Sequence, residues 1–146
     1  AFVLKFVKDL YRLRIEHPKR CLLVVEETAQ FAPQAQMSGQ AENVRLFVSV
    51  ATGGRKFGLN VLLTAQRQSL VDSNLYTQCN VRIFLRTSEF SDWNRRIKKY
   101  VPPAMGIGYE DIRNFKSGEA IVLSRWTPDA RVHLELPRVP MRKAAL

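Results

Sequence analysis

An unbroken apolar run that ends in two carboxylates constrains this chain more than any other feature. The run is Cys21-Leu22-Leu23-Val24-Val25, and Glu26 and Glu27 follow it directly. A continuous apolar run of this length, bounded by charged residues, is typical of a strand buried on both faces of a parallel sheet. Both carboxylates then lie at the carboxyl end of the strand, where open α/β sheets place their ligand crevice. The alternative is a buried strand that ends in solvated charge.

The remaining pattern alternates strands with helices. Helical spacing of apolar residues predicts helices over 2–16, 41–52 and 88–100 and a shorter one near 109–115. Apolar or alternating segments predict strands over 21–26, 59–65, 80–86, 119–125 and 131–136. Strand, helix, strand, helix, strand is the order of an α/β protein with a mostly parallel sheet and flanking helices. The last two predicted strands, joined by a turn at Pro128-Asp129, form an antiparallel C-terminal β extension.

Charge and cysteine content narrow the class of protein. The 146 residues suggest one domain, and the net charge of +10 suggests an anionic partner such as nucleic acid, nucleotide or a membrane surface. Solubility alone is the alternative explanation of that charge. Cys21 and Cys79 have no CxxC spacing, which favours buried reduced thiols and a cytoplasmic location. No apolar run approaches the roughly 18 residues of a transmembrane helix, so no membrane segment is indicated.

A second polar strand end lies at Gln66. The apolar segment 59–65 runs into Gln66 and Arg67, and we expect it to lie beside the strand that carries Glu27. A neutral amide there can donate to a γ-phosphate oxygen and accept from an attacking water, so it can sense the phosphate. The alternative is an amide that caps a loop. The sequence therefore predicts that Glu27 and Gln66 emerge side by side from adjacent strands.

Five motifs in order resemble one known family. They are Glu26-Glu27-Thr28-Ala29, Gly54-Arg55-Lys56-Phe57-Gly58-Leu59, Thr64-Ala65-Gln66-Arg67, Gln78-Cys79-Asn80 and Ser117-Gly118-Glu119-Ala120. Over residues 20–136 the chain resembles the C-terminal half of the RecA-like motor domain of HerA/FtsK-type P-loop ATPases, most closely the HerA-like branch. The implied division is 1–136 as part of that domain and 137–146 as a basic tail.

The resemblance implies roles for particular residues. Glu27 matches the catalytic glutamate that polarises water, and Glu26 matches the acid that holds Mg²⁺ through a water ligand, although Asp is commoner there. Gln66 matches the sensor glutamine. Arg55 is the first candidate, and Arg67 the second, for an arginine that reaches a nucleotide across a subunit boundary. The alternative for Arg55 is a solvated, charged turn.

One expected motif is absent from the sequence. No G-x-x-x-x-G-K-[S/T] phosphate loop, the Walker A motif, occurs in these 146 residues. In the resembled family this loop follows the first strand of the domain, ahead of the elements found here. The sequence therefore predicts negligible ATPase activity for residues 1–146 alone.

The predicted helix at 88–100 is strongly basic. Its apolar residues are Phe90, Trp93 and Ile97, which we expect to face inward. The other side then carries four cations: Arg95, Arg96, Lys98 and Lys99. These are candidates for contacts with nucleic-acid phosphates or with a neighbouring subunit. A solvated helix face is the alternative, and the segments 34–43 and 68–78 are alternative DNA-contacting loops.

The resemblance implies the C-terminal portion of an ATP-driven double-stranded DNA translocase or helicase. Its cofactors are ATP and Mg²⁺, its usual assembly is a hexameric ring, and a HerA-type protein implies a NurA-type nuclease partner. A second hypothesis is a degenerate, non-catalytic module that binds DNA or a protein partner. A third is a monomeric P-loop enzyme that acts on a small substrate.

Overall fold

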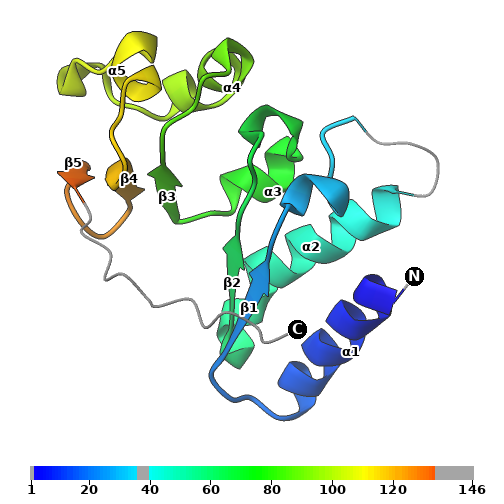
Figure 1. The fold of residues 1–146 in the computed structure, drawn as a ribbon. Coiled ribbons are helices and arrows are strands. Elements are labelled where there is room, and N and C mark those ends of the chain that lie inside the picture. Colours follow the sequence, from blue (N-terminus) through cyan, green and yellow to red (C-terminus); the bar gives the residue numbers. More distant parts are fainter. Residues whose placement is uncertain (1, 36–39, 134–146) are drawn as a thin grey trace, which may run out of the picture.

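The computed structural model of the 146-residue chain describes residues 2–35 and 40–133. Figure 1 shows an α/β arrangement with the helices and strands in the expected order. The elements are α1 (Phe2–Glu16), β1 (Cys21–Val25), α2 (Ala41–Gly53), β2 (Leu59–Leu63), α3 (Ser73–Thr77), β3 (Val81–Phe84), α4 (Phe90–Arg95), α5 (Tyr109–Arg113), β4 (Glu119–Ser124) and β5 (Ala130–His133). Single 3₁₀ turns cover Thr28–Gln30, Gly54–Phe57, Gln68–Leu70, Ile97–Lys99 and Pro103–Met105.

The first half of the chain forms what we call the N-terminal region, which contains β1, β2, α1, α2 and α3. Strands β1 and β2 pair in parallel, from Cys21 opposite Leu59 to Val25 opposite Leu63. Helices α1 and α2 pack on one face of this pair and supply part of its core. The fully buried side chains of this core include Val7, Phe47, Val50, Leu59 and Leu75. The prediction of a parallel pair is confirmed.

Gly58 makes the close approach of the two strands possible. Its backbone has a φ of 80°, a left-handed conformation that favours glycine. A Cβ atom at this position would lie 2.6 Å from the carbonyl oxygen of Lys19. The carbonyl of Gly58 also accepts a 2.9 Å hydrogen bond from the amide of Cys21, which fixes where the pairing begins. The glycine of this motif therefore has a structural role at the start of β2.

The predicted burial of β1 on both faces is wrong for the described residues. Leu22 and Val24 are 59% and 51% exposed, and Leu62 of β2 is 47% exposed. Alternate side chains of a strand point to opposite faces, and α1 and α2 cover only the face that carries Leu23 and Val25. One face of the parallel pair is therefore apolar and open.

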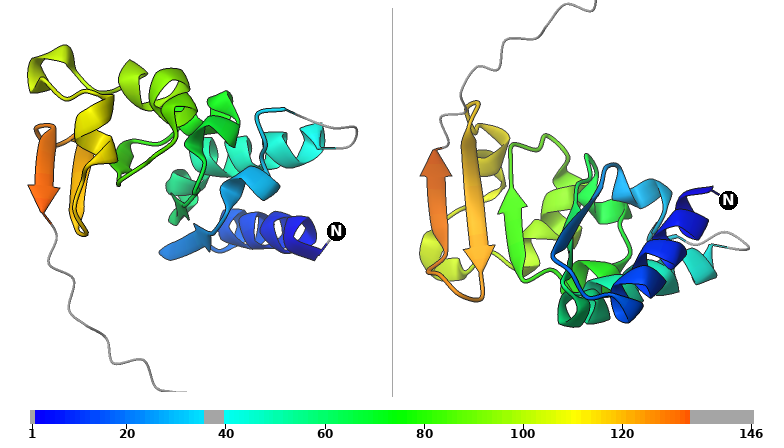
Figure 2. Two further views of the ribbon diagram at one scale, coloured as in Figure 1. Left: turned by 45° about the horizontal axis from the view of Figure 1, so that its top comes forward. Right: turned by 90° about the horizontal axis from the view of Figure 1, so that it is seen from below.

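The second half of the chain forms the C-terminal region, which contains β3, β4, β5, α4 and α5. The strands are antiparallel in the order β3-β4-β5 (Figure 2, right), which confirms the predicted β extension. A separate core lies between this sheet and the helical segments around α4 and α5. Its fully buried members include Phe84, Ile97, Ile112, Phe115 and Ile121.

Strand β3 does not join the parallel sheet, contrary to the sequence-based prediction. Among the described strands it pairs only with β4, and its other edge lines a cleft of about 800 Å³ that we call the central cleft. The outer edge of β2 forms the opposite wall, so residues 59–66 and 80–87 line the cleft along its length. Strands β2 and β3 run in the same direction (Figure 1), and no strand of the described residues lies between them.

The predicted helix at 88–100 is interrupted. Helix α4 ends at Arg95, and Arg96, with φ −126° and ψ −70°, separates it from the turn Ile97–Lys99. Trp93 and Ile97 are buried as predicted, but Phe90 is 58% exposed. Parts of the candidate DNA-contacting loop 34–43 and of the predicted strand 131–136, and all of the basic tail 137–146, lie outside the described residues. Among the helices described, none is long and apolar enough to cross a membrane.

Candidate functional site

The tips of β1 and β2 bring Glu27 and Gln66 together at one end of the central cleft. The ladder of hydrogen bonds continues past the strands, because Thr64 donates to the carbonyl of Val25 (3.0 Å) and Thr28 donates to the carbonyl of Thr64 (2.9 Å). Glu27 is half-buried and Gln66 is exposed, and both line the cleft. The predicted adjacency of the two strand tips is therefore confirmed.

Glu27 has a strained backbone. Its φ of 48° and ψ of 51° place it in the left-handed region, and no other non-glycine residue in the described ranges has a positive φ. Such a conformation costs an L-residue about 1–2 kcal/mol and is concentrated at functional sites. The next residue holds it in place, since the Thr28 hydroxyl donates to the carbonyl of Val25 and the Thr28 carbonyl accepts from the amides of Phe31 and Ala32.

Glu26 lies beside Glu27 at the strand end and is exposed. A carboxylate oxygen is a hard ligand of the kind that Mg²⁺ accepts, and Mg²⁺ in nucleotide sites keeps several waters and binds one or two carboxylates plus phosphate oxygens. Glu26 fits that donor set. The described residues contain no group of three or more His, Cys, Asp or Glu side chains that could hold a metal ion. A Mg²⁺ ion near Glu26 would therefore take its ligands from water and phosphate, and Glu26 would hold one of those waters.

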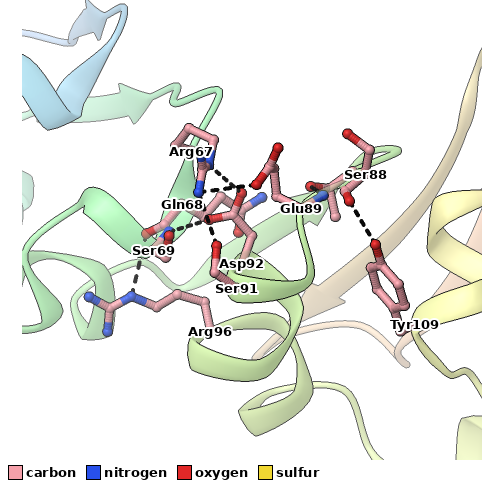
Figure 3. A network of polar contacts seen from close by, with 10 residues as sticks. Arg67, Gln68, Ser69, Ser88, Glu89, Ser91, Asp92, Arg96 and Tyr109 are labelled. Atoms are coloured by element: carbon pink, nitrogen blue, oxygen red, sulfur yellow. Dashed lines mark hydrogen bonds and ion pairs between the residues drawn. The ribbon is translucent and has the colours of Figure 1, made fainter.

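Arg67 is tied to helix α4 of its own chain (Figure 3). Its Nε donates to Asp92 Oδ2 at 3.2 Å, and one terminal nitrogen donates to Ser91 Oγ at 3.0 Å and lies 3.3 Å from Glu89 Oε2. The Arg67 side chain is 41% exposed, whereas that of Asp92 is 1% exposed. The structure thus brings Arg67 together with Asp92 and Glu89.

Asp92 and Arg96 hold the residues that follow Gln66. Both belong to what we call the α4 segment, residues 89–99. Asp92 Oδ1 accepts a 2.8 Å hydrogen bond from the amide of Ser69. Arg96 donates to the carbonyls of Val71 (2.5 Å) and Gln68 (3.4 Å) and to the side chain of Gln34. Sequence reasoning missed Asp92, because an acidic residue in the first turn of a helix is ordinarily explained by the helix dipole alone.

Comparisons with known proteins place the chain in a recognised structural class. No family model matches it. The DNA double-strand break repair helicase HerA of Pyrococcus furiosus is 29% identical over 104 residues, which cover 71% of this chain and 18% of that protein. The chain is HerA-like.

Solved structures of the genome packaging NTPase B204 of Sulfolobus turreted icosahedral virus 2 share the fold. The complex with AMP has a TM-score of 0.67 at 17% identity, over 90% of the HerA-like chain and 62% of B204. The complex with ATP-gammaS has a TM-score of 0.65 at 17% identity, over 91% and 62%. The predicted P-loop NTPase fold is therefore confirmed. The HerA-like chain spans less than two thirds of B204 and less than a fifth of HerA.

Arg55 lies at the other end of the parallel pair from Gln66. It is an exposed residue of the turn Gly54–Phe57 that precedes β2, whereas Gln66 follows β2. A five-residue strand rises about 3.3 Å per residue, so roughly 16 Å of strand separates the two ends. The structure therefore does not bring Arg55 to the Glu27 tip of the same chain. An exposed arginine in this position remains a candidate for contact with a neighbouring subunit.

The four basic residues at 95–99 do not share one face. Arg95, Lys98 and Lys99 are exposed, but Arg96 is 8% exposed and its guanidinium lies 5.4 Å from the centre of the Tyr76 ring. The prediction of a common basic side is wrong for Arg96. The physical reason is that its guanidinium satisfies backbone carbonyls of the 68–71 turn. Three of the four cations, Arg95, Lys98 and Lys99, are therefore exposed.

Two titratable groups near the cleft are perturbed by burial. Both Cys79 and Tyr76 line the cleft, and burial raises the pKa of the Cys79 thiol and that of the Tyr76 phenol. The nearby Arg82 guanidinium partly opposes both shifts. Cys79 and Cys21 are both free and partly buried.

Proposed function

We propose that the HerA-like chain is the part of an ATP-driven double-stranded DNA translocase that orients water and senses the terminal phosphate. The observation that carries the proposal is the placement of Glu27 and Gln66 on adjacent strand tips at one end of the central cleft. In open α/β sheets ligands bind outside the carboxyl ends of the strands. Strain at Glu27, of the kind that collects at functional sites, supports the same assignment.

The central cleft supports a specific origin for the missing phosphate loop. The outer edges of β2 and β3 face it, and exposed apolar side chains of both strands line it, among them Leu62, Val81 and Ile83. An unpaired strand edge readily accepts a further strand. In our proposal a strand from polypeptide outside these residues fills the cleft and joins both sheets. If it runs parallel to β2, the loop that follows it reaches Glu27 and Gln66.

The residues of this chain then have distinct tasks. ATP with Mg²⁺, when bound, supplies a terminal phosphoryl group open to attack by water. Glu27 accepts a hydrogen bond from the water and orients it, while Gln66 donates its amide N–H toward the phosphate. Glu26 holds a water of the metal shell. Arg55 contributes positive charge to the nucleotide of a neighbouring subunit, and Arg67 is the second candidate for that role.

Duplex DNA is the proposed substrate of movement. The net charge of +10 suits a polyanion, HerA is named a DNA repair helicase and B204 a genome packaging NTPase. We further propose a hexameric ring, a NurA-type nuclease partner and a cytoplasmic location. Arg95, Lys98 and Lys99 are the candidate phosphate contacts, with Arg96 excluded from direct contact by its burial. Neutralising the three should reduce the salt slope of DNA binding by about 0.9 per lost phosphate contact.

The test is ATP turnover by the natural gene product that contains this chain, with and without duplex DNA. We expect turnover that duplex DNA stimulates and that Gln66→Ala lowers sharply, whereas residues 1–146 alone turn over negligible ATP. Turnover that survives Gln66→Ala unchanged would contradict the proposal. The degenerate-module hypothesis predicts a different result, namely salt-dependent DNA binding or protein binding with no turnover in the gene product.

A further inference from the structure

The residues that follow Gln66 are held both by residues 32–34 of their own region, where the backbone amide of Gln34 donates to the carbonyl of Leu70 at 2.7 Å, and by the α4 segment. Arg67, Gln68, Ser69 and Val71 each have a polar contact with Asp92 or Arg96 (Figure 3 draws those of Arg67, Gln68 and Ser69). Gln66 itself is exposed at the cleft. Its position therefore depends in part on a turn that has anchors in the other region of the molecule.

Asp92 is the central anchor of that turn. Its two carboxylate oxygens serve different partners, since Oδ1 accepts from the Ser69 amide and Oδ2 accepts from Arg67 Nε. Asp92 is 1% exposed, so water does not compete for these bonds. Hydrogen bonds to a charged group are about twice as strong as neutral ones, and they fix geometry as well as energy.

We propose that Asp92 is a positioning residue for Gln66. It holds Arg67 on one side and Ser69 on the other, and so sets the direction in which the chain leaves β2 at Gln66. This proposal rests on the proposed function, because the direction of Gln66 matters to a phosphate sensor. It goes beyond that function by giving the C-terminal region, through α4, control over a side chain at the nucleotide end of the cleft.

Glu89 provides a matched control. It also pairs with Arg67, at 3.3 Å, but its side chain is 48% exposed and makes no described contact with the 68–71 turn. Asp92→Asn and Glu89→Gln each remove one carboxylate charge from the same guanidinium. Asp92→Asn additionally turns an amide N–H₂ group toward Arg67 or Ser69, so one of the two anchoring bonds is lost.

The first measurement is amide hydrogen exchange in the natural gene product without nucleotide. We expect Asp92→Asn to speed exchange at Ser69 and Leu70 about tenfold, since a bond to a charged acceptor is lost, and Glu89→Gln to change it less than twofold. If Asp92→Asn unfolds the protein, Arg67→Gln breaks the same ion pair from its more exposed side. Unchanged exchange at residues 68–70 in a folded variant overturns the proposal, whatever the ATPase result.

The second measurement is a double-mutant cycle on ATP turnover. Asp92→Asn should lower kcat about tenfold or more, because misplacement of an active-site group by about 1 Å can cost about 10²-fold. In a Gln66→Ala background the same change should have less than a twofold effect, since Asp92 acts only through Gln66. An equal loss in both backgrounds means a general structural role and overturns the proposal. A gene product with no turnover at all refutes the proposed function, and the exchange result then decides the positioning claim alone.

Discussion

The N-terminal and C-terminal regions both combine helices with strands, yet their sheets place the ends of the strands differently. The parallel pair β1–β2 ends with both carboxyl tips on one edge, where Glu27 and Gln66 lie. In the antiparallel sheet β3–β4–β5, neighbouring strands end at opposite edges, and none of the three catalytic candidates (Glu27, Gln66 and Arg55) belongs to it. Parallel pairing gathers consecutive strand ends at one place, which is why our proposal assigns the chemistry to the first region.

A second comparison concerns how the two regions are joined to each other. Each has its own apolar core, and no strand pairing connects the two sheets within the described residues. The described links include polar contacts between residues 67–71 and the α4 segment, and the packing of Tyr76 of α3 against Tyr100 and the C-terminal core. The C-terminal region therefore contacts the residues next to Gln66.

Glu27→Gln is the sharpest test of the assignment of chemistry to the N-terminal region. We expect it to lower the ATP turnover of the natural gene product by about 10²–10⁴-fold, the range for a positioned proton-accepting group, with KM for ATP changed little. Glu110→Gln, an exposed carboxylate change in α5, should leave turnover within twofold of the unaltered protein. Equal effects of the two changes would remove the distinction between the regions.

Removal of a core phenyl ring tests whether the two regions unfold separately. Phe47→Ala in the N-terminal region and Phe115→Ala in the C-terminal region should each cost about 3–5 kcal/mol of unfolding free energy. Because the cores are separate, Phe47→Ala should speed amide exchange in β1 and β2 and leave β4 protected, and Phe115→Ala should do the reverse. Exchange that rises uniformly in both regions would show one cooperative unit instead.

A pair of glycine changes compares backbone constraint in the two regions. Gly58→Ala should lower the unfolding free energy by about 2 kcal/mol or more, because it combines a left-handed backbone with a close contact at the Lys19 carbonyl. Gly106→Ala has a left-handed φ of 62° but open space around the new methyl group, so it should cost only about 1 kcal/mol. Urea unfolding measures both, and an equal cost would mean that the contact at Gly58 relaxes freely.

The smallest expected effect is a loss of stability in alkali that originates at Tyr76 and Cys79. Burial raises both pKa values in the folded state, so the folded state retains these protons more tightly than the unfolded state. The resulting stability is complete below the ordinary pKa values of about 8.5–10 and is lost as pH rises above them. Tyr76→Phe should flatten the decline in unfolding free energy between about pH 9 and 11. A decline of unchanged slope would place its origin elsewhere.

The sequence predicts the elements well because apolar period and turn chemistry act locally. The run at 21–25, the glycines that bracket Arg55-Lys56 and the polar ends at Glu27 and Gln66 were sufficient to place two parallel strands and their tips. The partner of β3 and the covering of β1 were not predictable from them. An apolar strand indicates that burial is favourable, but it does not specify which polypeptide provides the cover.

The contacts that anchor residues 67–71 could not be predicted from the sequence either. Arg96 occupies a position that helical spacing assigns to the solvated side, but the helix ends at Arg95 and the guanidinium turns inward to backbone carbonyls. Asp92 binds an amide 23 residues away in the sequence, and no local pattern marks such a contact. Residues that act through long-range hydrogen bonds to backbone are the ones that spacing arguments overlook.

The left-handed backbone at Glu27 has a consequence for how the sequence evolves. Glycine or asparagine would relieve the strain at that position, so a lineage that no longer needed the carboxylate would gain folding stability from the first such mutation. Decay of the catalytic function should therefore leave an early trace at residue 27, before the surrounding apolar strand changes. A survey of natural variants at this one position would separate relatives that retain the catalytic function from those that have lost it, without any enzyme assay.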